Sequence, residues 1–591
     1  MNRACAVLPA VAAVSLLLAA CSTGTPPQTE STTARASSAA PGAPPAPPAP
    51  PAFAALAAPA APQEVTVTGS RSRFAPGEAP KFTYAAPPLL AYPMPQVMHQ
   101  PGADKFPDAS ANKSILVEEQ PVSTFSTDVD TASYAFVRRQ LNDGRLPPAA
   151  AVRVEEMVNY FPYDYARPTS RTQPFAVTTG VMPSPWKAEN QLLHIAVRGF
   201  DIKAAERPPM NVVLLVDVAG SMGPPDRLPL LKQGFRLFAD SLRPQDRVAI
   251  VTYASGTTVA LEPTTGQDKA KVRDAIDALG AGGATAGADG LQRAYALAER
   301  HFDKAAVNRV ILATDGDFNV GITNPRELEQ FIANKRKSGI YLSILGVGRG
   351  NLNDALMQRL AQSGNGNAAY IDSLLEARKA LGEELGSTMF PIANDVKMQV
   401  EFNPAQVAAY RLIGYETRML NRQDFKDDKI DAGDMGAGHT VTAIYEITPA
   451  SASARLVDPL RYGEGRKPAP RAKNDELCFV RVRYKLPGES SSRLVEQPVR
   501  AASLHRTLQA APPDQRFAVA VAAFGQRLRG EQQVADYSYA DIAELANGAR
   551  GTDAGRLSRR IREAGADDGS AEQGGRGRSA VMRPAGRRVG G

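Results

Sequence analysis

Hydrophobic and polar positions follow two different patterns along the chain. In residues 209–388, four near-continuous apolar runs are separated by stretches with the periodicity of amphipathic helices. The runs are VVLLVD, RVAIVTYA, RVILATD and IYLSILGVG. Apolar runs of this kind are typical of parallel strands that are covered on both faces. The pattern therefore predicts an open, doubly wound α/β domain, whose ligands bind beyond the carboxyl ends of its strands.

Alternating apolar and polar positions flank this domain on both sides. FAVTTGVM and LLHIAVRGFDI precede it, and VKMQVEFNP, HTVTAIYEITP and CFVRVRYKL follow it. These stretches predict half-buried strands, and neither set alone has enough strands to bury both faces of a sandwich. We therefore expect the two sets to form one β-sandwich into which the α/β domain is inserted. The connections to that domain would lie side by side near Arg207 and Pro391, opposite its ligand-binding loops.

Short helices are expected around the sandwich. Asp130 is placed to cap one helix, and AVRVEEMVNYF predicts a second. Near the other end of the chain, RFAVAVAAFGQRLRG and ADIAELANGAR predict two more helices, and Ser538 with Asp541 resembles a capping box for the last one.

The first twenty residues have the composition of an export signal. Arg3 precedes the apolar run AVLPAVAAVSLLLAA, which is too short to span a bilayer as a mature helix. The run ends in LAAC, and Leu18–Cys21 resembles the lipobox of bacterial lipoproteins, in which the cysteine is lipidated. Ser22, in place of an inner-membrane retention aspartate, points to the outer membrane of a Gram-negative bacterium. We expect Cys21 to carry a lipid anchor on a membrane that the chain does not cross.

Composition completes the division of the chain. A Ser/Thr-rich and then Pro/Ala-rich stretch after Cys21 predicts an extended tether. The expected parts are a signal peptide (1–20), a tether (21–110), an N-terminal domain (111–208), the α/β domain (209–388), a β-rich C-terminal domain with terminal helices (389–549) and a disordered basic tail (550–591).

The distribution of charge argues against a nucleic-acid-binding protein, and the cysteines argue against an intrachain disulfide. The formal net charge is +7, but from Arg550 onward ten arginines face five acids, so that much of the surplus lies in the tail. A nucleic-acid-binding face is therefore not expected. Cys5 leaves with the signal and Cys21 would be acylated, so that Cys478 has no partner for an intrachain disulfide and is interpreted as a small core residue.

Polar side chains collect where the predicted parallel strands end. Asp217 ends the first strand and is followed by Ser221, Thr285 lies in the glycine-rich GAGGATAG, and Asp315 ends a later strand. Parallel topology brings these loops to one edge of the sheet. Carboxylate and hydroxyl oxygens suit a hard cation, so we predict a Mg²⁺ site with Ca²⁺ and Mn²⁺ as the alternative ions.

At these residues the sequence resembles the von Willebrand factor type A family. That family's metal-ion-dependent adhesion site uses D-x-S-x-S, a distant Thr and a distant Asp, which Asp217, Ser221, Thr285 and Asp315 match. Ala219 does not match, because a serine hydroxyl is expected there. Other stretches of the sequence (LLVDVAGSM, LATDGDFNVG, NPAQVAAYRLIGYETRML) are similar to those of bacterial type A lipoproteins. These lipoproteins have an associated N-terminal domain and a C-terminal domain of unknown function.

The resemblance implies cation-dependent binding of a protein, with an acidic residue of the partner completing the coordination. Losing the hydroxyl at Ala219 should cost about 1–2 kcal/mol, because water can take that position on Mg²⁺. We therefore expect a weakened cation site. The alternative is a metal-independent envelope scaffold that uses the same fold.

An enzyme is not expected. The five histidines are scattered without metal spacing, and neither a G-x-S-x-G elbow nor a P-loop occurs. We expect a lipid-anchored envelope protein that binds a partner which the sequence does not identify.

Overall fold

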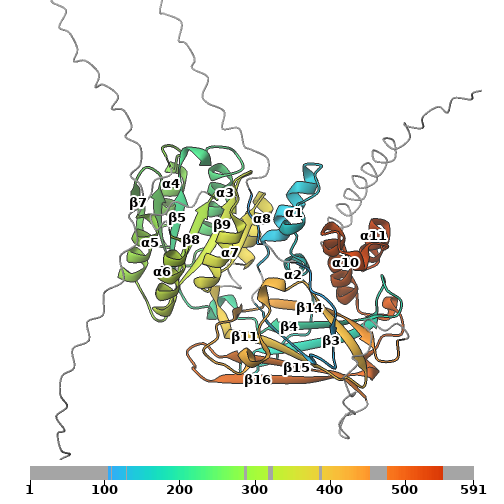
Figure 1. Cartoon of the computed structure of the whole chain (residues 1–591). Coiled ribbons are helices and arrows are strands. Elements are labelled where there is room, and N and C mark those ends of the chain that lie inside the picture. The colour runs from blue at the N-terminus through green and yellow to red at the C-terminus, as the bar shows by residue number, and fades with distance from the viewer. Residues whose placement is uncertain are drawn as a thin grey trace, which may run out of the picture. The chain divides into compact units, whose positions relative to one another are not determined.

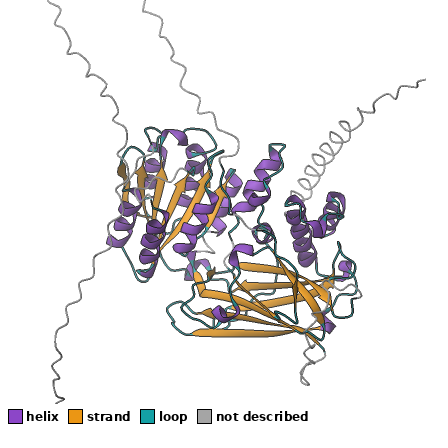
Figure 2. Cartoon of the chain, in the orientation of Figure 1, coloured by secondary structure: helices purple, strands orange, loops and turns teal. Residues whose placement is uncertain are grey.

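The computed structural model describes residues 104–107, 110–127, 130–284, 289–316, 324–384, 389–452 and 475–549 (Figures 1 and 2). All of them belong to one compact unit of the chain, Pro93–Gly591. The predicted signal peptide, Cys21 and the basic tail lie outside the described residues. No helix in the described part is both long and apolar enough to cross a membrane.

The α/β domain is built on a six-stranded sheet of order β10-β9-β8-β5-β6-β7. All neighbours in it are parallel except β7, which is antiparallel to β6. The strands are β5 (Met210–Asp217), β6 (Arg247–Tyr253), β7 (Thr257–Thr265), β8 (Val307–Thr314), β9 (Ile340–Val347) and β10 (Ala368–Ile371). The predicted doubly wound α/β domain is therefore confirmed.

Helices cover both faces of this sheet (Figures 1 and 2). They are α3 (Leu228–Ser241), α4 (Lys269–Ala278), α5 (Gly290–Arg300), α6 (Pro325–Lys337), α7 (Asp354–Ser363) and α8 (Leu374–Arg378), which continues into the π-helical turn η4 (Lys379–Glu384). Successive residues of β5 show the two faces. Leu214 packs in the same cluster as Phe235 of α3, whereas Leu215 packs in the same cluster as Leu291 of α5. Burial on both faces explains why the strands read as continuous apolar runs.

Two antiparallel sheets form the second part of the structure. One has the order β1-β12-β14-β4-β3, and the other has the order β13-β11-β15-β16 with β2 also paired to β11. The strands before the α/β domain are β1 (Ile115–Leu116), β2 (Val122–Ser126), β3 (Phe175–Pro183) and β4 (Gln191–Gly199). Those after it are β11 (Pro391–Phe402), β12 (Val407–Ile413), β13 (Gly433–Gly436), β14 (Thr440–Pro449), β15 (Glu476–Lys485) and β16 (Ser492–Arg500).

Strands from the two sides of the insertion share both sheets and one core, as predicted. In one sheet β4 pairs with β14, with Val197 opposite Val441, and in the other β2 pairs with β11. Side chains of both sheets, among them Phe125 and Tyr445, belong to one buried cluster. The connections into and out of the α/β domain are neighbours, because the Arg207 guanidinium lies 5.6 Å from the Phe390 ring centroid.

A cluster of four helices, two of which contact β14, lies on the outer face of the β1-β12-β14-β4-β3 sheet and changes the expected burial. They are α1 (Ala132–Asn142), α2 (Val154–Asn159), α10 (Pro513–Leu528) and α11 (Tyr539–Gly548). Leu192 and Ala196 of β4 pack in their cluster, whereas Leu193 and Ile195 face the sandwich core. The prediction that β4 is half-buried was therefore wrong, because helices cover its second face.

Several local predictions have clear outcomes. Ser538 and Asp541 form the predicted capping box at α11. Asp130, expected to cap α1, precedes the N-cap residue Thr131, and its carboxylate accepts hydrogen bonds from the Ala368 amide and from Arg418. Cys478 is buried in the sandwich core, and burial raises the pKa of its thiol, as expected for a core residue.

Short 3-10 turns complete the described structure. They are η1 (Ala149–Ala151), η2 (Ala204–Glu206), η3 (Gly220–Met222), η5 (Glu416–Arg418), η6 (Arg422–Phe425), η7 (Ala501–Ser503), η8 (Leu508–Ala510) and η9 (Gln532–Val534). Within the predicted tether (21–110), Asp104 and Lys105 hydrogen-bond to the backbone of residues 352–355.

Candidate functional site

Two buried carboxylates lie side by side at the carboxyl edge of the α/β sheet. Asp217 is the last residue of β5, and Asp315 directly follows β8. The two strands are hydrogen-bonded neighbours in parallel register up to Val216 and Ala313. Both aspartates are fully buried. The sequence prediction that parallel topology gathers these acids at one edge is confirmed.

The loop after β5 is fixed by its own backbone. The Ala219 amide donates to Oδ1 of Asp217 over 2.9 Å, and the chain then forms the short turn η3 that contains Ser221. The Val218 amide donates to the Tyr253 carbonyl over 3.0 Å, which ties this loop to the end of β6. Burial raises the pKa of Tyr253 well above its usual value, and the negative charge of Asp217 raises it further.

The glycine-rich loop that leads to Thr285 lies against the same turn. The Gly220 amide donates to the Gly283 carbonyl over 2.9 Å, and the Gly282 amide donates to the Val218 carbonyl over 2.8 Å. Gly283 has a φ of +81°, a conformation that favours glycine. Thr285 itself lies outside the described residues, so its predicted role as a ligand stays a prediction.

One hydroxyl in this loop lacks a partner. Oγ of Ser221 is buried and makes no hydrogen bond within the described residues. A buried polar atom left without a partner costs about 1–3 kcal/mol, so a further ligand at this position would stabilise the loop. The neighbouring Ala219 is also buried, but it presents only a methyl group. The oxygen set of Asp217 and Ser221 fits a hard cation, and the missing hydroxyl reduces the number of protein ligands.

A buried arginine at the same edge was not foreseen from the sequence. Arg227 precedes α3, and its Nη1 donates to Oδ2 of Asp315 and, over 2.8 Å, to the Ser221 carbonyl. Its Nη2 donates to the Arg349 carbonyl over 3.1 Å. Gly348 makes room for this side chain, because a Cβ at that position would collide with it. A basic residue at a helix N-terminus opposes the helix dipole, which is the local signal that marks Arg227 as unusual.

The charges described at the site are therefore two carboxylates and one guanidinium. Within the described residues, no group of three or more His, Cys, Asp or Glu side chains could hold a metal ion. A cation here would depend on Asp217, on hydroxyl oxygens and on water, because Asp315 is already paired with Arg227.

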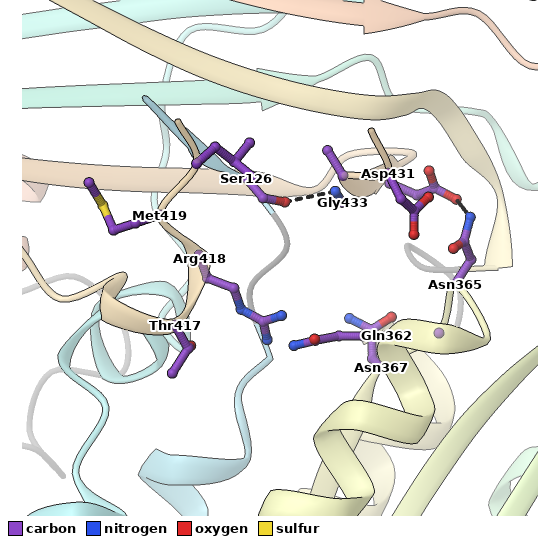
Figure 3. Close-up of a pocket in the computed structure, with 13 residues that line it drawn as sticks. Ser126, Gln362, Asn365, Asn367, Thr417, Arg418, Met419, Asp431 and Gly433 are labelled. Atoms are coloured by element: carbon purple, nitrogen blue, oxygen red, sulfur yellow. Dashed lines mark hydrogen bonds between the residues drawn. The ribbon is translucent and has the colours of Figure 1, made fainter. Parts of the chain in front are cut away.

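A second polar site lies between the α/β domain and the sandwich (Figure 3). It is a cavity of about 190 Å³ lined by Gln362, Asn365 and Asn367 on one side and by Arg418, Asp431 and Asp434 on the other. Nδ2 of Asn365 donates to Oδ2 of Asp434 over 3.0 Å. Burial raises the pKa of Asp434 to about 7 and also raises that of Asp431. Oδ1 of Asp434 accepts a hydrogen bond from the Asp395 amide, so both of its carboxylate oxygens have a partner.

Three family models match the chain. A model described as von Willebrand factor matches residues 100–194, the von Willebrand factor type A domain matches residues 211–383, and a model described as uncharacterized protein YfbK, C-terminal, matches residues 387–561.

Known proteins and solved structures resemble different shares of the chain. The uncharacterized protein YfbK of Escherichia coli (strain K12) is 44% identical over 482 residues, which are 80% of this chain and 82% of that protein. Inter-alpha-trypsin inhibitor heavy chain H4 of Homo sapiens is 28% identical over 171 residues, which are 28% of this chain and 18% of that protein. The solved von Willebrand factor type A from Catenulispora acidiphila is 17% identical, with a TM-score of 0.36, over 66% of this chain and 89% of that chain.

Proposed function

Because the chain belongs to the YfbK family and contains a von Willebrand factor type A domain, we propose that it is an interaction protein of the cell envelope that binds a partner protein through a divalent cation. Asp217 and Ser221 would hold the ion, with Thr285 as a further ligand and Mg²⁺ as the expected species. An acidic residue of the partner would complete the set of ligands around the ion. The buried Oγ of Ser221, which lacks a partner within the described residues, carries this proposal.

Each residue of the loop has a separate task in this proposal. Asp217 supplies the full negative charge that attracts a divalent ion, and the Ala219 amide orients its carboxylate through Oδ1. Burial of Asp217 excludes bulk water, which strengthens the attraction of its carboxylate for a cation. Asp289, at the N-terminus of α5, is the N-cap residue of that helix and is assigned no role at the ion.

The proposed location rests on the N-terminal sequence. LAAC ends the apolar run at Cys21, and Ser22 follows it. Lipidation of Cys21 would attach the chain to the outer membrane, and the Pro/Ala-rich tether would hold the folded part away from the lipid. We assign no catalytic activity to the protein and no nucleic-acid partner.

Titration of Mg²⁺ into the purified mature chain by calorimetry tests the cation site. Wild type should release or absorb heat with a saturating isotherm, and Asp217→Ala should not. Asp246, a buried aspartate of the same domain that lies before β6, provides the control variant Asp246→Asn. Indistinguishable isotherms for wild type and Asp217→Ala would refute the cation site.

A metal-independent scaffold is the second candidate, and the Arg227–Asp315 pair favours it. In that pair the Arg227 guanidinium neutralises Asp315 without an ion. The two candidates differ in one experiment, which is capture of membrane proteins on the immobilised chain with and without EDTA. A partner retained equally in both conditions, and equally by Asp217→Ala, supports the scaffold.

A further inference from the structure

We propose that Arg227 lowers the affinity of the site for divalent ions, because its ion pair with Asp315 keeps that carboxylate from binding the ion. This inference rests on the proposed function, because it assigns a second residue that determines the affinity of the same site. Arg227 lies outside the motif that predicted the ion ligands, and Asp315, which that motif does contain, has a different role here from the one that the motif implies.

Burial and several hydrogen bonds fix the position of the Arg227 side chain. The side chain is only 2% exposed, and its two terminal nitrogens contact three separate segments of the domain. Nη1 reaches the Ser221 carbonyl and the Asp315 carboxylate, and Nη2 reaches the Arg349 carbonyl. The guanidinium thus connects the loop after β5, the end of β8 and the loop after β9.

The consequence for a cation follows from charge. An arginine stays protonated at every physiological pH, so its charge cannot be removed when an ion arrives. A divalent ion bound by Asp217 and Ser221 would share this low-dielectric edge with a fixed positive charge, which repels it. The single carboxylate of Asp315 cannot pair fully with both the guanidinium and the divalent ion. The ion is therefore expected on Asp217 and Ser221, with Asp315 left to Arg227.

The test compares Arg227→Gln with wild type in the full mature chain, using calorimetric titration of Mg²⁺. Removing the guanidinium frees the second carboxylate for the ion, so the dissociation constant should fall by about tenfold or more. Arg227→Lys keeps the charge and should retain the weak binding of wild type, which separates the effect of charge from that of packing. An Arg227→Gln protein that binds Mg²⁺ no more tightly than wild type overturns the inference.

Arg243 provides a matched control. It pairs with the buried Asp246 at 2.9 Å in the same domain, but at the opposite edge of the sheet, where β6 begins. Arg243→Gln also leaves a buried aspartate without its arginine, yet it should leave Mg²⁺ affinity unchanged. Tighter binding by both variants would mean that general loosening of the domain, and not the charge of Arg227, sets the affinity, which would overturn the inference.

A second measurement needs no variant. Crystals of the wild-type chain grown with Mn²⁺, whose anomalous signal locates the ion, should place it on Asp217 and Ser221 with Arg227 still on Asp315. An ion on Asp315 with Arg227 displaced also supports competition between the two cations. An ion bound directly by Asp315 while Arg227 keeps its contact refutes it.

The two proposals fail in different ways. If wild type binds no Mg²⁺ and Arg227→Gln does, the proposed function falls and the role of Arg227 stands. If wild type binds Mg²⁺ and Arg227→Gln binds it equally well, the proposed function stands and the role of Arg227 falls. If neither protein binds, both are refuted.

Discussion

Restoring the missing hydroxyl at position 219 should change the stability of the protein in opposite senses with and without a divalent ion. Ala219 is 1% exposed, and its φ of −59° and ψ of 164° are accessible to serine without strain. Its amide is held by Asp217, so the new Oγ enters the edge of the sheet beside that carboxylate. Ala219→Ser therefore adds one oxygen to the proposed ligands and changes little else.

The magnitude follows from the two states of that oxygen. In the presence of a chelator, the Ala219→Ser variant buries a hydroxyl that has left water, at a cost of about 1 kcal/mol. With Mg²⁺ the same oxygen replaces a water ligand, and a gain of about 1.4 kcal/mol corresponds to tenfold tighter binding. At saturating Mg²⁺ that tighter binding adds about 1.4 kcal/mol to the free energy of unfolding, which offsets the cost.

Urea denaturation in EDTA and in saturating Mg²⁺, combined with calorimetric titration, measures both quantities. The matched control is Ala249→Ser, which buries a hydroxyl in β6 within the core on the other side of the sheet. Ala249→Ser should destabilise the protein in both buffers, because its new hydroxyl is not part of the proposed Mg²⁺ site. Equal Mg²⁺ affinity for wild type and Ala219→Ser, or equal destabilisation of the two variants in Mg²⁺, would refute the assignment of position 219 to the site.

Three further predictions concern other parts of the chain. Asp217→Ala should abolish Mg²⁺ binding, measured by calorimetry, because it removes the carboxylate at the centre of the proposed ligand set; retained binding would place the ion elsewhere. Cys21→Ser should leave an unlipidated protein that fractionates as soluble, and a wild type that is itself soluble with an unmodified N-terminus contradicts the lipid anchor. Burial raises the pKa of Asp434 from 3.8 to about 7, so the folded state binds more protons than the unfolded state between those values and stability should fall as pH rises through that window. Asp434→Asn should flatten this part of a plot of unfolding free energy against pH, and an unchanged slope would show that Asp434 does not cause it.

The sequence predicted the strands that obey simple patterns and missed several others, among them β7 and β16. Both β7 and β16 contain a proline, Pro263 and Pro498, and a proline within an apolar run argues against a strand. In the structure both are edge strands, where the missing amide of proline leaves no interior ladder bond unmade. Their position at the edge depends on the whole sheet, so no local pattern could reveal it.

The candidate site shows the same limit more sharply. Asp217, Ser221 and Asp315 could be found because a strand end and a family motif mark each of them. Arg227 was missed, because a basic charge at a helix N-terminus is only a weak signal and its partner Asp315 lies 88 residues further along the chain. The interpretation of Asp130 failed for a related reason, since its partner Arg418 lies 288 residues away. Local propensity favoured a helix cap for Asp130, but a buried charge requires a partner of opposite sign, and the tertiary fold supplied one.

Two departures of the site from the family motif act in the same direction. Ala219 removes an oxygen ligand, and Arg227 neutralises Asp315, which otherwise would attract the ion. In the proposed site each change is expected to lower the affinity for a divalent cation, so their combination would favour a compartment in which such cations are abundant. Extracellular Ca²⁺-binding modules, for comparison, work with dissociation constants of roughly 10⁻⁴–10⁻³ M, far weaker than those of cytosolic Ca²⁺ buffers. A weak site is therefore consistent with a lipid-anchored position in the envelope. A dissociation constant of the wild type for Mg²⁺ in the nanomolar range would contradict this reasoning.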